Sequence, residues 1–136
     1  MTGRRGLMPK AAKRERRLGL EQEQLPEKFL FELLHAHRYR EAMSFLSEVK
    51  NINAVDDQTG MTALHWAAAH CVKNLVNALW LRDDLDELAR DSKGRYASEL
   101  AAIQGRDEVL AEELMMREKS FGELRGIIPW PKPELP

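Results

Sequence analysis

The stretch that decides the fold of this 136-residue chain is Asn53-Ala54-Val55-Asp56-Asp57-Gln58-Thr59-Gly60-Met61-Thr62-Ala63-Leu64-His65-Trp66-Ala67-Ala68-Ala69. Asp56 and Gly60 bracket a polar turn, in which a glycine tolerates a positive φ. Thr62 precedes a run of good helix formers and suits the N-cap position of that helix. Ala67 and Ala68 are small, so a neighbouring helix can approach closely. The stretch therefore predicts a polar turn followed by a capped helix.

The same stretch resembles the opening of an ankyrin repeat, whose pattern is Asn-Ala-x-Asp-x-x-Gly-x-Thr-Pro-Leu-His-x-Ala-Ala. Two departures from the pattern are visible. The turn from Asp56 to Gly60 holds one extra residue, and Ala63 stands where the family prefers proline. In the family the histidine is structural. We accordingly expect a ring nitrogen of His65 to donate to a backbone carbonyl and tie the turn to the helix, without a catalytic or metal-binding role.

Further copies of the pattern flank the central one. The second, degenerate copy is Ala89-Arg90-Asp91-Ser92-Lys93-Gly94-Arg95-Tyr96-Ala97-Ser98-Glu99-Leu100-Ala101-Ala102, and its Gly94 follows Gly60 by 34 residues. A weaker copy upstream ends at about Asn53. The resemblance covers residues 28–118 as repeats at about 28–53, 54–88 and 89–118. It implies an all-α fold, a short ankyrin-repeat solenoid of helix-turn-helix units with hairpin-like connecting loops.

Apolar periodicity places two helices in each repeat. The expected ranges are 28–36, 40–48, 62–70, 73–82, 97–104 and 107–118. Trp66 is expected in the core. In the fourth helix Leu75, Val76, Leu79 and Trp80 are expected to face inward. Leu81 also fits this stripe, so one of these residues must lie at its rim. Val109 is placed in the core stripe of the last helix, together with Leu110 and Leu114.

Composition indicates an ordinary helical domain, with 43% hydrophobic and 32% charged residues. No apolar run approaches the ~18 residues of a membrane span, so no membrane association is expected. The N-terminus lacks the apolar core of a secretory signal. Cys71 is the only cysteine and permits no internal disulfide, which fits a reducing compartment. We expect a cytoplasmic protein with Cys71 as a buried, unreactive thiol.

Charge is unevenly spread along the chain. Residues 1–20 carry seven basic residues against Glu15, which gives 7 − 1 = +6, so the remainder carries −1 − 6 = −7. Glycines at positions 3, 6 and 19 disfavour a continuous helix, and residues 1–25 are expected to form a basic arm. Its readings are a solvated tail, a contact to an acidic protein, a contact to nucleic acid, or an organelle-targeting peptide. Nucleic-acid contact would use Arg4, Arg5, Lys10, Lys13, Arg14, Arg16 and Arg17.

Residues 119–136 combine apolar side chains with prolines. Phe121, Leu124, Ile127, Ile128 and Trp130 are followed or interrupted by Pro129, Pro131, Pro133 and Pro136. Proline forbids regular helix and favours extended conformation. Because terminal repeats expose an apolar face, one reading is that this tail folds back as a cap on the third repeat. The other reading is that it docks on a partner through a proline-recognition groove.

Catalytic motifs are absent from the sequence. It has no phosphate loop, dinucleotide glycine motif, paired cysteine ligands or His-Glu-x-x-His. The carboxylates are expected at solvated helix positions. We therefore expect no enzyme activity, no cofactor and no metal site.

Contact residues follow from the resemblance. In the family they lie after the turn aspartate, after the turn glycine and after the Ala-Ala pair. Carried over, they are Ala36, His37, Asp57, Gln58, Thr59, Met61, Ala69, His70, Ser92, Lys93, Arg95, Ile103 and Gln104. His37, His70 and Gln104 would form a polar row, and Met61 and Ile103 would be apolar contacts.

The sequence thus favours a non-catalytic protein–protein interaction module, an adaptor or small accessory subunit that binds a protein through its concave surface and tails. The alternative is an accessory protein of a nucleic-acid-containing particle that uses the basic arm. The sequence does not identify the partner or the oligomeric state.

Overall fold

A computed structural model describes residues 19–132, and within this range the chain is helical and has no strand. The helices are α2 (Gly19–His35), α3 (Tyr39–Phe45), the short 3-10 helix η1 (Leu46–Glu48), α4 (Ala63–Ala69), α5 (Lys73–Trp80), α6 (Ala97–Ile103) and α7 (Glu108–Arg125). The all-α prediction is confirmed for this part of the chain.

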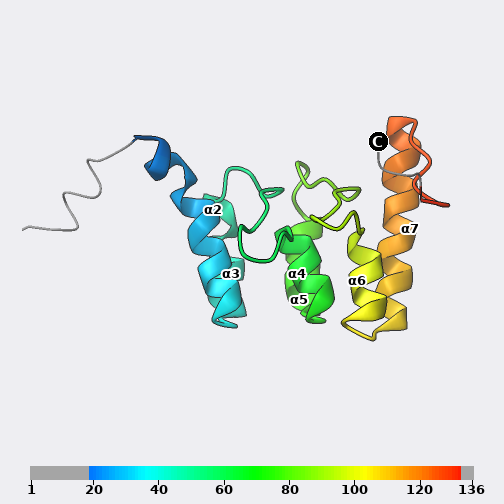
Figure 1. The fold of residues 1–136 in the computed structure, drawn as a ribbon, viewed down its shortest axis with the longest axis horizontal. Coiled ribbons are helices and arrows are strands. Elements are labelled where there is room, and N and C mark those ends of the chain that lie inside the picture. Colours follow the sequence, from blue (N-terminus) through cyan, green and yellow to red (C-terminus); the bar gives the residue numbers. More distant parts are fainter. Residues whose placement is uncertain (1–18, 133–136) are drawn as a thin grey trace, which may run out of the picture.

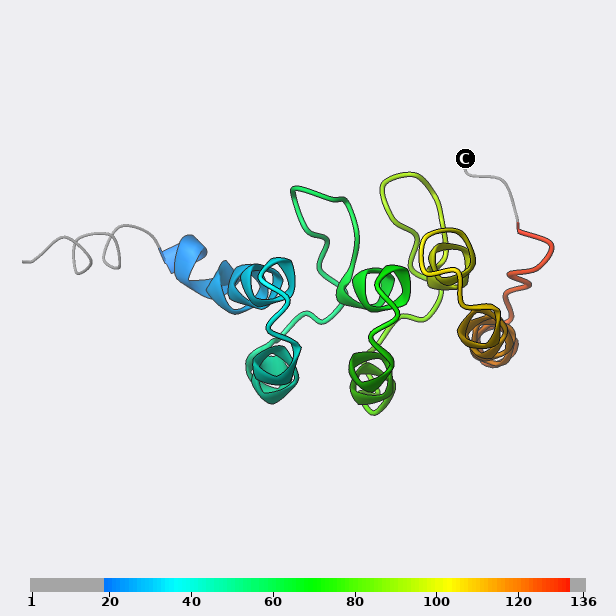
Figure 2. The same ribbon diagram turned by 90° about the horizontal axis from the view of Figure 1, so that it is seen from below.

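The α-helices lie as three pairs, α2/α3, α4/α5 and α6/α7, placed side by side (Figure 1). Seen from below, α2, α4 and α6 form one row and α3, α5 and α7 form a second row (Figure 2). Contacts between pairs run from α4 to α6 and from α3 to α5. The two loops that join the pairs both project beyond the row of α2, α4 and α6 (Figure 2). One side of the molecule is therefore built from helices of one row and two loop tips.

Polar side chains fix where three of the helices begin. Thr62 Oγ1 accepts the backbone N–H of His65 and caps α4, as the sequence predicts. The backbone N–H of Tyr96 donates to Glu99 at the start of α6. Asp107 accepts the N–H of Leu110 at the start of α7. Each cap satisfies a backbone N–H group that the helix itself leaves without a partner.

Small residues let the second and third pairs approach closely. Ala67 and Ala68 in α4 are completely buried. A Cβ added to Gly105, in the turn between α6 and α7, would lie 2.7 Å from the Ala68 carbonyl oxygen and 2.8 Å from Cys71 Sγ. The turn can therefore pack on the end of α4 only because residue 105 is a glycine.

A single apolar core runs through all three pairs. Its members include Leu30, Leu34, Ala42, Leu46, Ile52, Leu64, Trp66, Leu75, Val76, Leu79, Leu100, Leu110 and Leu114. Trp66 is buried as expected. Val109 is exposed, so its placement in the core stripe is wrong. Leu110 and Leu114 already fill the inward face of α7, and Val109 is left on the outer face.

The first and last helices are longer than the sequence pattern predicts. Helix α2 begins at Gly19 and contains Pro26, whereas the prediction began near residue 28 and assigned residues 1–25 to an arm. Residues 20–25 are Leu, Glu, Gln, Glu, Gln and Leu, which all have high helix propensity. Helix α7 continues to Arg125 instead of 118 and ends at Gly126, which adopts the left-handed conformation.

The chain turns back after α7. The backbone N–H of Ile127 donates to the carbonyl of Gly122 at 2.8 Å, and the indole nitrogen of Trp130 donates to Glu118 at 2.9 Å. Residues 126–132, called the strap below, thus run along α7 toward its start. Of the two readings of the C-terminal tail, packing against the third pair describes the strap; residues 133–136 lie outside the described range.

Two glycines with similar backbone angles offer a matched stability test. Gly60 has φ +75° and Gly126 has φ +71°, but only at Gly60 would a Cβ meet another group, Ser92 Oγ at 2.1 Å. Gly126→Ala is expected to cost about 1–2 kcal/mol for the left-handed conformation alone. Gly60→Ala should cost more, because it also pushes the two loops apart. Urea unfolding measures both variants, and equal costs would contradict the close packing of the loops.

Candidate functional site

The first projecting loop is organised by Asp56. Its carboxylate accepts the hydroxyl of Thr59 at 2.9 Å, the backbone N–H of Gln58 at 3.3 Å and a ring nitrogen of His35 at 2.7 Å. Burial alone would raise the pKa of Asp56, but the hydrogen bonds from His35, Thr59 and Gln58 outweigh it. The pKa is therefore held below its ordinary value of 3.8. An ionised Asp56 fixes the loop and joins its base to the end of α2.

The second loop repeats this arrangement around Asp91. Its carboxylate accepts the backbone N–H groups of Lys93 and Arg95, both at 2.9 Å, and pairs with the Arg95 guanidinium at 2.8 Å. Burial opposes ionisation here too. The bonds from Arg95 and Lys93 prevail and lower the pKa of Asp91. Each loop thus has one buried aspartate at its base and polar residues at its tip.

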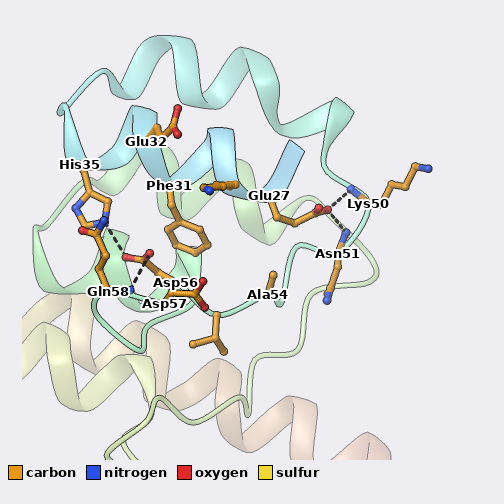
Figure 3. A pocket seen from close by; sticks show the side chains of 12 residues that line it. Glu27, Phe31, Glu32, His35, Lys50, Asn51, Ala54, Asp56, Asp57 and Gln58 are labelled. Atoms are coloured by element: carbon orange, nitrogen blue, oxygen red, sulfur yellow. Dashed lines mark hydrogen bonds and ion pairs between the residues drawn. The ribbon is translucent and has the colours of Figure 1, made fainter. Parts of the chain in front are cut away.

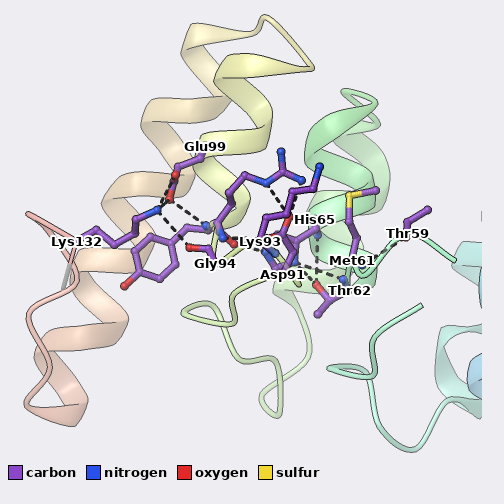
Figure 4. Close-up of polar contacts among 11 residues, drawn as sticks. Thr59, Met61, Thr62, His65, Asp91, Lys93, Gly94, Glu99 and Lys132 are labelled. Atoms are coloured by element: carbon purple, nitrogen blue, oxygen red, sulfur yellow. Dashed lines mark hydrogen bonds and ion pairs between the residues drawn. The ribbon is translucent and has the colours of Figure 1, made fainter. Parts of the chain in front are cut away.

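The two loops are also joined to each other and to α4, and Figure 4 shows the position of His65 of α4 among these contacts. The backbone N–H of Ser92 donates to the carbonyl of Gly60 at 2.9 Å. His65, in α4, donates from Nε2 to the Arg95 carbonyl at 2.8 Å, and its Nδ1 lies 2.7 Å from Thr62 Oγ1. His65 therefore makes the expected bond to a backbone carbonyl, and that carbonyl belongs to the following loop. These bonds hold the two loops against each other and against α4.

A hollow of about 800 Å³ lies between α2 and the first loop (Figure 3). It is open to solvent along one side and lined by Glu27, Lys28, Phe31, Glu32, His35, Lys50, Asn51, Ala54, Val55, Asp56, Asp57 and Gln58. The carboxylate of Glu27 accepts the backbone N–H groups of Lys50 and Asn51, at 2.9 and 2.8 Å. The His35–Asp56 pair closes the opposite end. Both ends are thus fixed by bonds between α2 and the loop.

The predicted contact residues divide by exposure. The exposed ones are Ala36, His37, Asp57, Gln58, His70, Ser92, Lys93, Ile103 and Gln104; Thr59 and Arg95 are half-buried, and Met61 and Ala69 are buried. Asp57 and Gln58 lie at the hollow. Ser92 and Lys93 lie on the second loop. The remaining exposed residues lie at the C-terminal ends of α2, α4 and α6, away from the loops. The structure therefore does not gather the whole set in one place.

Two of the predicted contacts are buried, and a third is bonded within its own loop. Met61 is only 7% exposed and joins the apolar core, so it is not a surface contact. Ala69 is buried by the same core. Arg95 is half-buried and engaged with Asp91, because its guanidinium completes the bonds that hold the second loop. Of the apolar contacts expected at the surface, Ile103 alone is exposed.

Three of the four histidines, His35, His37 and His70, form a cluster around Trp66. The ring of His70 stacks on Trp66 with centroids 4.3 Å apart, and the ring of His37 lies 5.8 Å from that of His70. The repeat pattern in the sequence aligns His37 with His70, but the backbone aligns His37 with the next residue, Cys71. Both residues occupy the turn after a helix and have a positive φ, +59° at His37 and +56° at Cys71. The two rings still meet, because His70 leans back onto its own helix through a bond to the Trp66 carbonyl.

Sequence reasoning missed the residues that shape the hollow. It singled out none of His35, Glu27 and Phe31 as a site residue. The partner of His35, Asp56, lies 21 residues away, and no short-range spacing connects them. The approach of α2 to the loop creates the hollow, and a repeat pattern alone does not report that approach.

Within residues 19–132, no group of three or more His, Cys, Asp or Glu side chains is placed to hold a metal ion. Cys71 is exposed, which corrects the expectation that it is buried, and its thiol donates to the Gly105 carbonyl at 3.0 Å. Partial burial and the charge of Asp107 raise the pKa of the Cys71 thiol, so less of the reactive thiolate is present.

The basic residues at positions 4, 5, 10, 13, 14, 16 and 17 all lie outside the described range. No helix between residues 19 and 132 has the length and apolarity needed to cross a membrane. Comparison of the chain with protein-family models, with curated proteins and with solved structures gave no match.

Proposed function

We propose that this chain is a protein-binding module of the ankyrin-repeat type, acting as an adaptor or small accessory subunit in the cytoplasm. The observation that carries the proposal is the side of the molecule formed by the row of α2, α4 and α6. There, two loops joined by a hydrogen bond present exposed polar tips beside an open hollow. Rigid, solvent-exposed side chains on projecting loops are common at binding sites, because a fixed scaffold positions them without ordering cost.

The repeated loop design supports the ankyrin-type part of the proposal. Asp56 and Asp91 occupy equivalent places in the two loops, and Gly60 and Gly94 both have positive φ. His65 connects the helix of one repeat to the loop of the next. Repeat proteins derive stability from such neighbour contacts and present one continuous face to partners. The alternative function, in a nucleic-acid-containing particle, depends on the basic arm and gains no support from residues 19–132.

The proposal predicts that protein partners contact the loop tips and not the outer helices. A photo-crosslinking amino acid placed at Gln58 or Lys93 should capture the same protein from native lysate. The same group at Asn77, exposed on α5 in the opposite row, should capture none of it. The double variant Asp57→Ala/Gln58→Ala should weaken binding of that protein at least about tenfold, equivalent to about 1.4 kcal/mol.

The control is Asn77→Ala, which should leave the affinity unchanged. Retention of the protein at high salt, with residues 1–18 deleted, would separate loop-mediated binding from binding by the basic arm. Capture that depends entirely on residues 1–18, or equal capture from Gln58 and Asn77, would overturn the proposal.

A further inference from the structure

Glu118 is the most deeply buried carboxylate among the described residues, with 1% of its surface exposed. The expectation that the carboxylates occupy solvated positions is therefore wrong for this residue. On the α6 side, the hydroxyl and the backbone N–H of Ser98 donate to it at 2.8 and 3.2 Å. On the strap side, the indole nitrogen of Trp130 donates at 2.9 Å. Glu118 is the point at which α6, α7 and the strap meet.

The strap covers this carboxylate and is anchored on both sides of it. Before Trp130, the strap packs so closely on Gly122 that a Cβ there would lie 2.5 Å from the Ile127 carbonyl oxygen. After Trp130, the Lys132 ammonium bonds both oxygens of Glu99, at 2.8 and 2.7 Å, and the carbonyl of Gly94 at 3.2 Å (Figure 4). Lifting the strap would remove the indole donor and bring water to Glu118.

We propose that the strap is a proton-coupled latch, whose closing over Glu118 is accompanied by uptake of a proton by that carboxylate. Burying a charge costs free energy, and closing the strap is the step that completes the burial. Ser98 can remain bonded in both protonation states, because a serine hydroxyl both donates and accepts. Acidification therefore favours the closed strap, and alkaline conditions favour release of residues 126–132.

The surroundings of Glu118 agree with this direction. Burial is the main cause that raises the pKa of Glu118, and the like charge of Glu99 adds to it. The hydrogen bonds from Trp130 and Ser98 lower the pKa, and the net result is a pKa of about 6 instead of the ordinary 4.5. The other charged groups nearby are the Lys132 ammonium, paired with Glu99, and the Arg90 guanidinium, above the ring of Tyr96. If opening restores the ordinary value, the difference of 6 − 4.5 = 1.5 units changes the closing equilibrium by up to roughly 30-fold.

Nuclear magnetic resonance of the full chain tests the latch directly. The side-chain carboxyl carbon of Glu118 should titrate near pH 6, and the indole N–H of Trp130 should shift with the same midpoint. Trp80 serves as the internal reference, because its indole nitrogen has no hydrogen-bond partner among the described residues, and because Trp66, unlike Trp80, stacks on the ring of His70. Glu118→Gln should abolish the shift of the Trp130 signal, whereas Glu99→Gln should leave a titration in place.

Opening the strap should return Glu118 to its ordinary titration. The variant Trp130→Ala/Lys132→Ala removes both anchors, and Gly122→Ala displaces the strap backbone independently. In each folded variant the midpoint should fall toward 4.5, the ordinary value for a glutamate. The proposal is overturned if the midpoint is the same with the strap closed and open, or if Trp130 does not follow Glu118. None of these outcomes depends on a binding partner, so they are independent of the proposed function.

Discussion

Replacing Leu79 by alanine is expected to lower the free energy of unfolding by about 2–5 kcal/mol. Leu79 lies on α5 with 0% of its surface exposed, within the core shared by all three helix pairs. Truncation removes buried methyl groups and leaves a cavity, since α5 is held by both α3 and α4 and cannot move in to fill it. The truncation should lower the denaturant midpoint of one cooperative unfolding transition. It should not divide the transition into two, because the central helix pair joins the other two pairs.

The matched control lies two residues away. Leu81 follows α5 and is 87% exposed, so Leu81→Ala should change the free energy of unfolding by no more than about 0.5 kcal/mol. Denaturant unfolding, followed by far-ultraviolet circular dichroism, measures both. A similar loss in the two variants would mean that the inward face of α5 has been assigned incorrectly.

This pair of leucines also shows what the sequence can and cannot predict. Periodicity found α5 and its inward stripe of Leu75, Val76, Leu79, Trp80 and Leu81, and it required one of these residues to lie at the rim. It did not say which one. Leu81 is the C-cap of α5 and still has helical backbone angles, so at 3.6 residues per turn it lies on the side of the helix opposite Leu79. Helix centres follow from local patterns, whereas helix ends depend on packing with the rest of the chain.

The candidate site was less accessible to sequence reasoning than the fold. The loop tips at Asp57, Gln58, Ser92 and Lys93 were predicted, because a repeated turn motif fixes their place locally. The pairings of His35 with Asp56 and of Glu118 with Trp130 were not predicted. The first pair is 21 positions apart and the second is 12 positions apart, and each forms only when separate segments pack together. A carboxylate such as Glu118 has the local sequence of a solvated helix residue, and it is buried because α6 and the strap pack on either side of it.

Replacing His65 by leucine is expected to cost on the order of 3 kcal/mol at neutral pH, because two polar groups lose their partner in a buried setting. The Arg95 carbonyl loses the Nε2 proton donor, and the Thr62 hydroxyl loses the Nδ1 acceptor. Leucine keeps the side chain apolar and of comparable size, so the loss reports the hydrogen bonds more than a cavity. The exposed His70, at the other end of the same helix, provides the control, and His70→Leu should have a small effect.

The cost of the His65 substitution should also depend on pH. Its contacts suit the neutral ring, with Nε2 donating to a carbonyl and Nδ1 accepting from a hydroxyl. Burial, first among the causes, lowers the pKa of His65 below its ordinary value of 6.5. At a pH between the pKa of His65 in the folded chain and 6.5, the unfolded chain binds a proton that the folded chain excludes. The stability that His65 contributes is therefore complete above pH 6.5 and is lost as the pH falls toward the folded-state value.

Denaturant unfolding of the wild type and of His65→Leu across this range isolates the effect, because titrations common to both chains cancel in the difference. The proton-linked contribution of Glu118 has the opposite sign, since a raised pKa favours the folded state as the pH falls from about 6 toward 4.5. Measured on the wild type alone, the two trends would partly mask each other. A difference between wild type and variant that stays constant below pH 6.5 would show that His65 is not held neutral, and the bond from α4 to the second loop would then need another explanation.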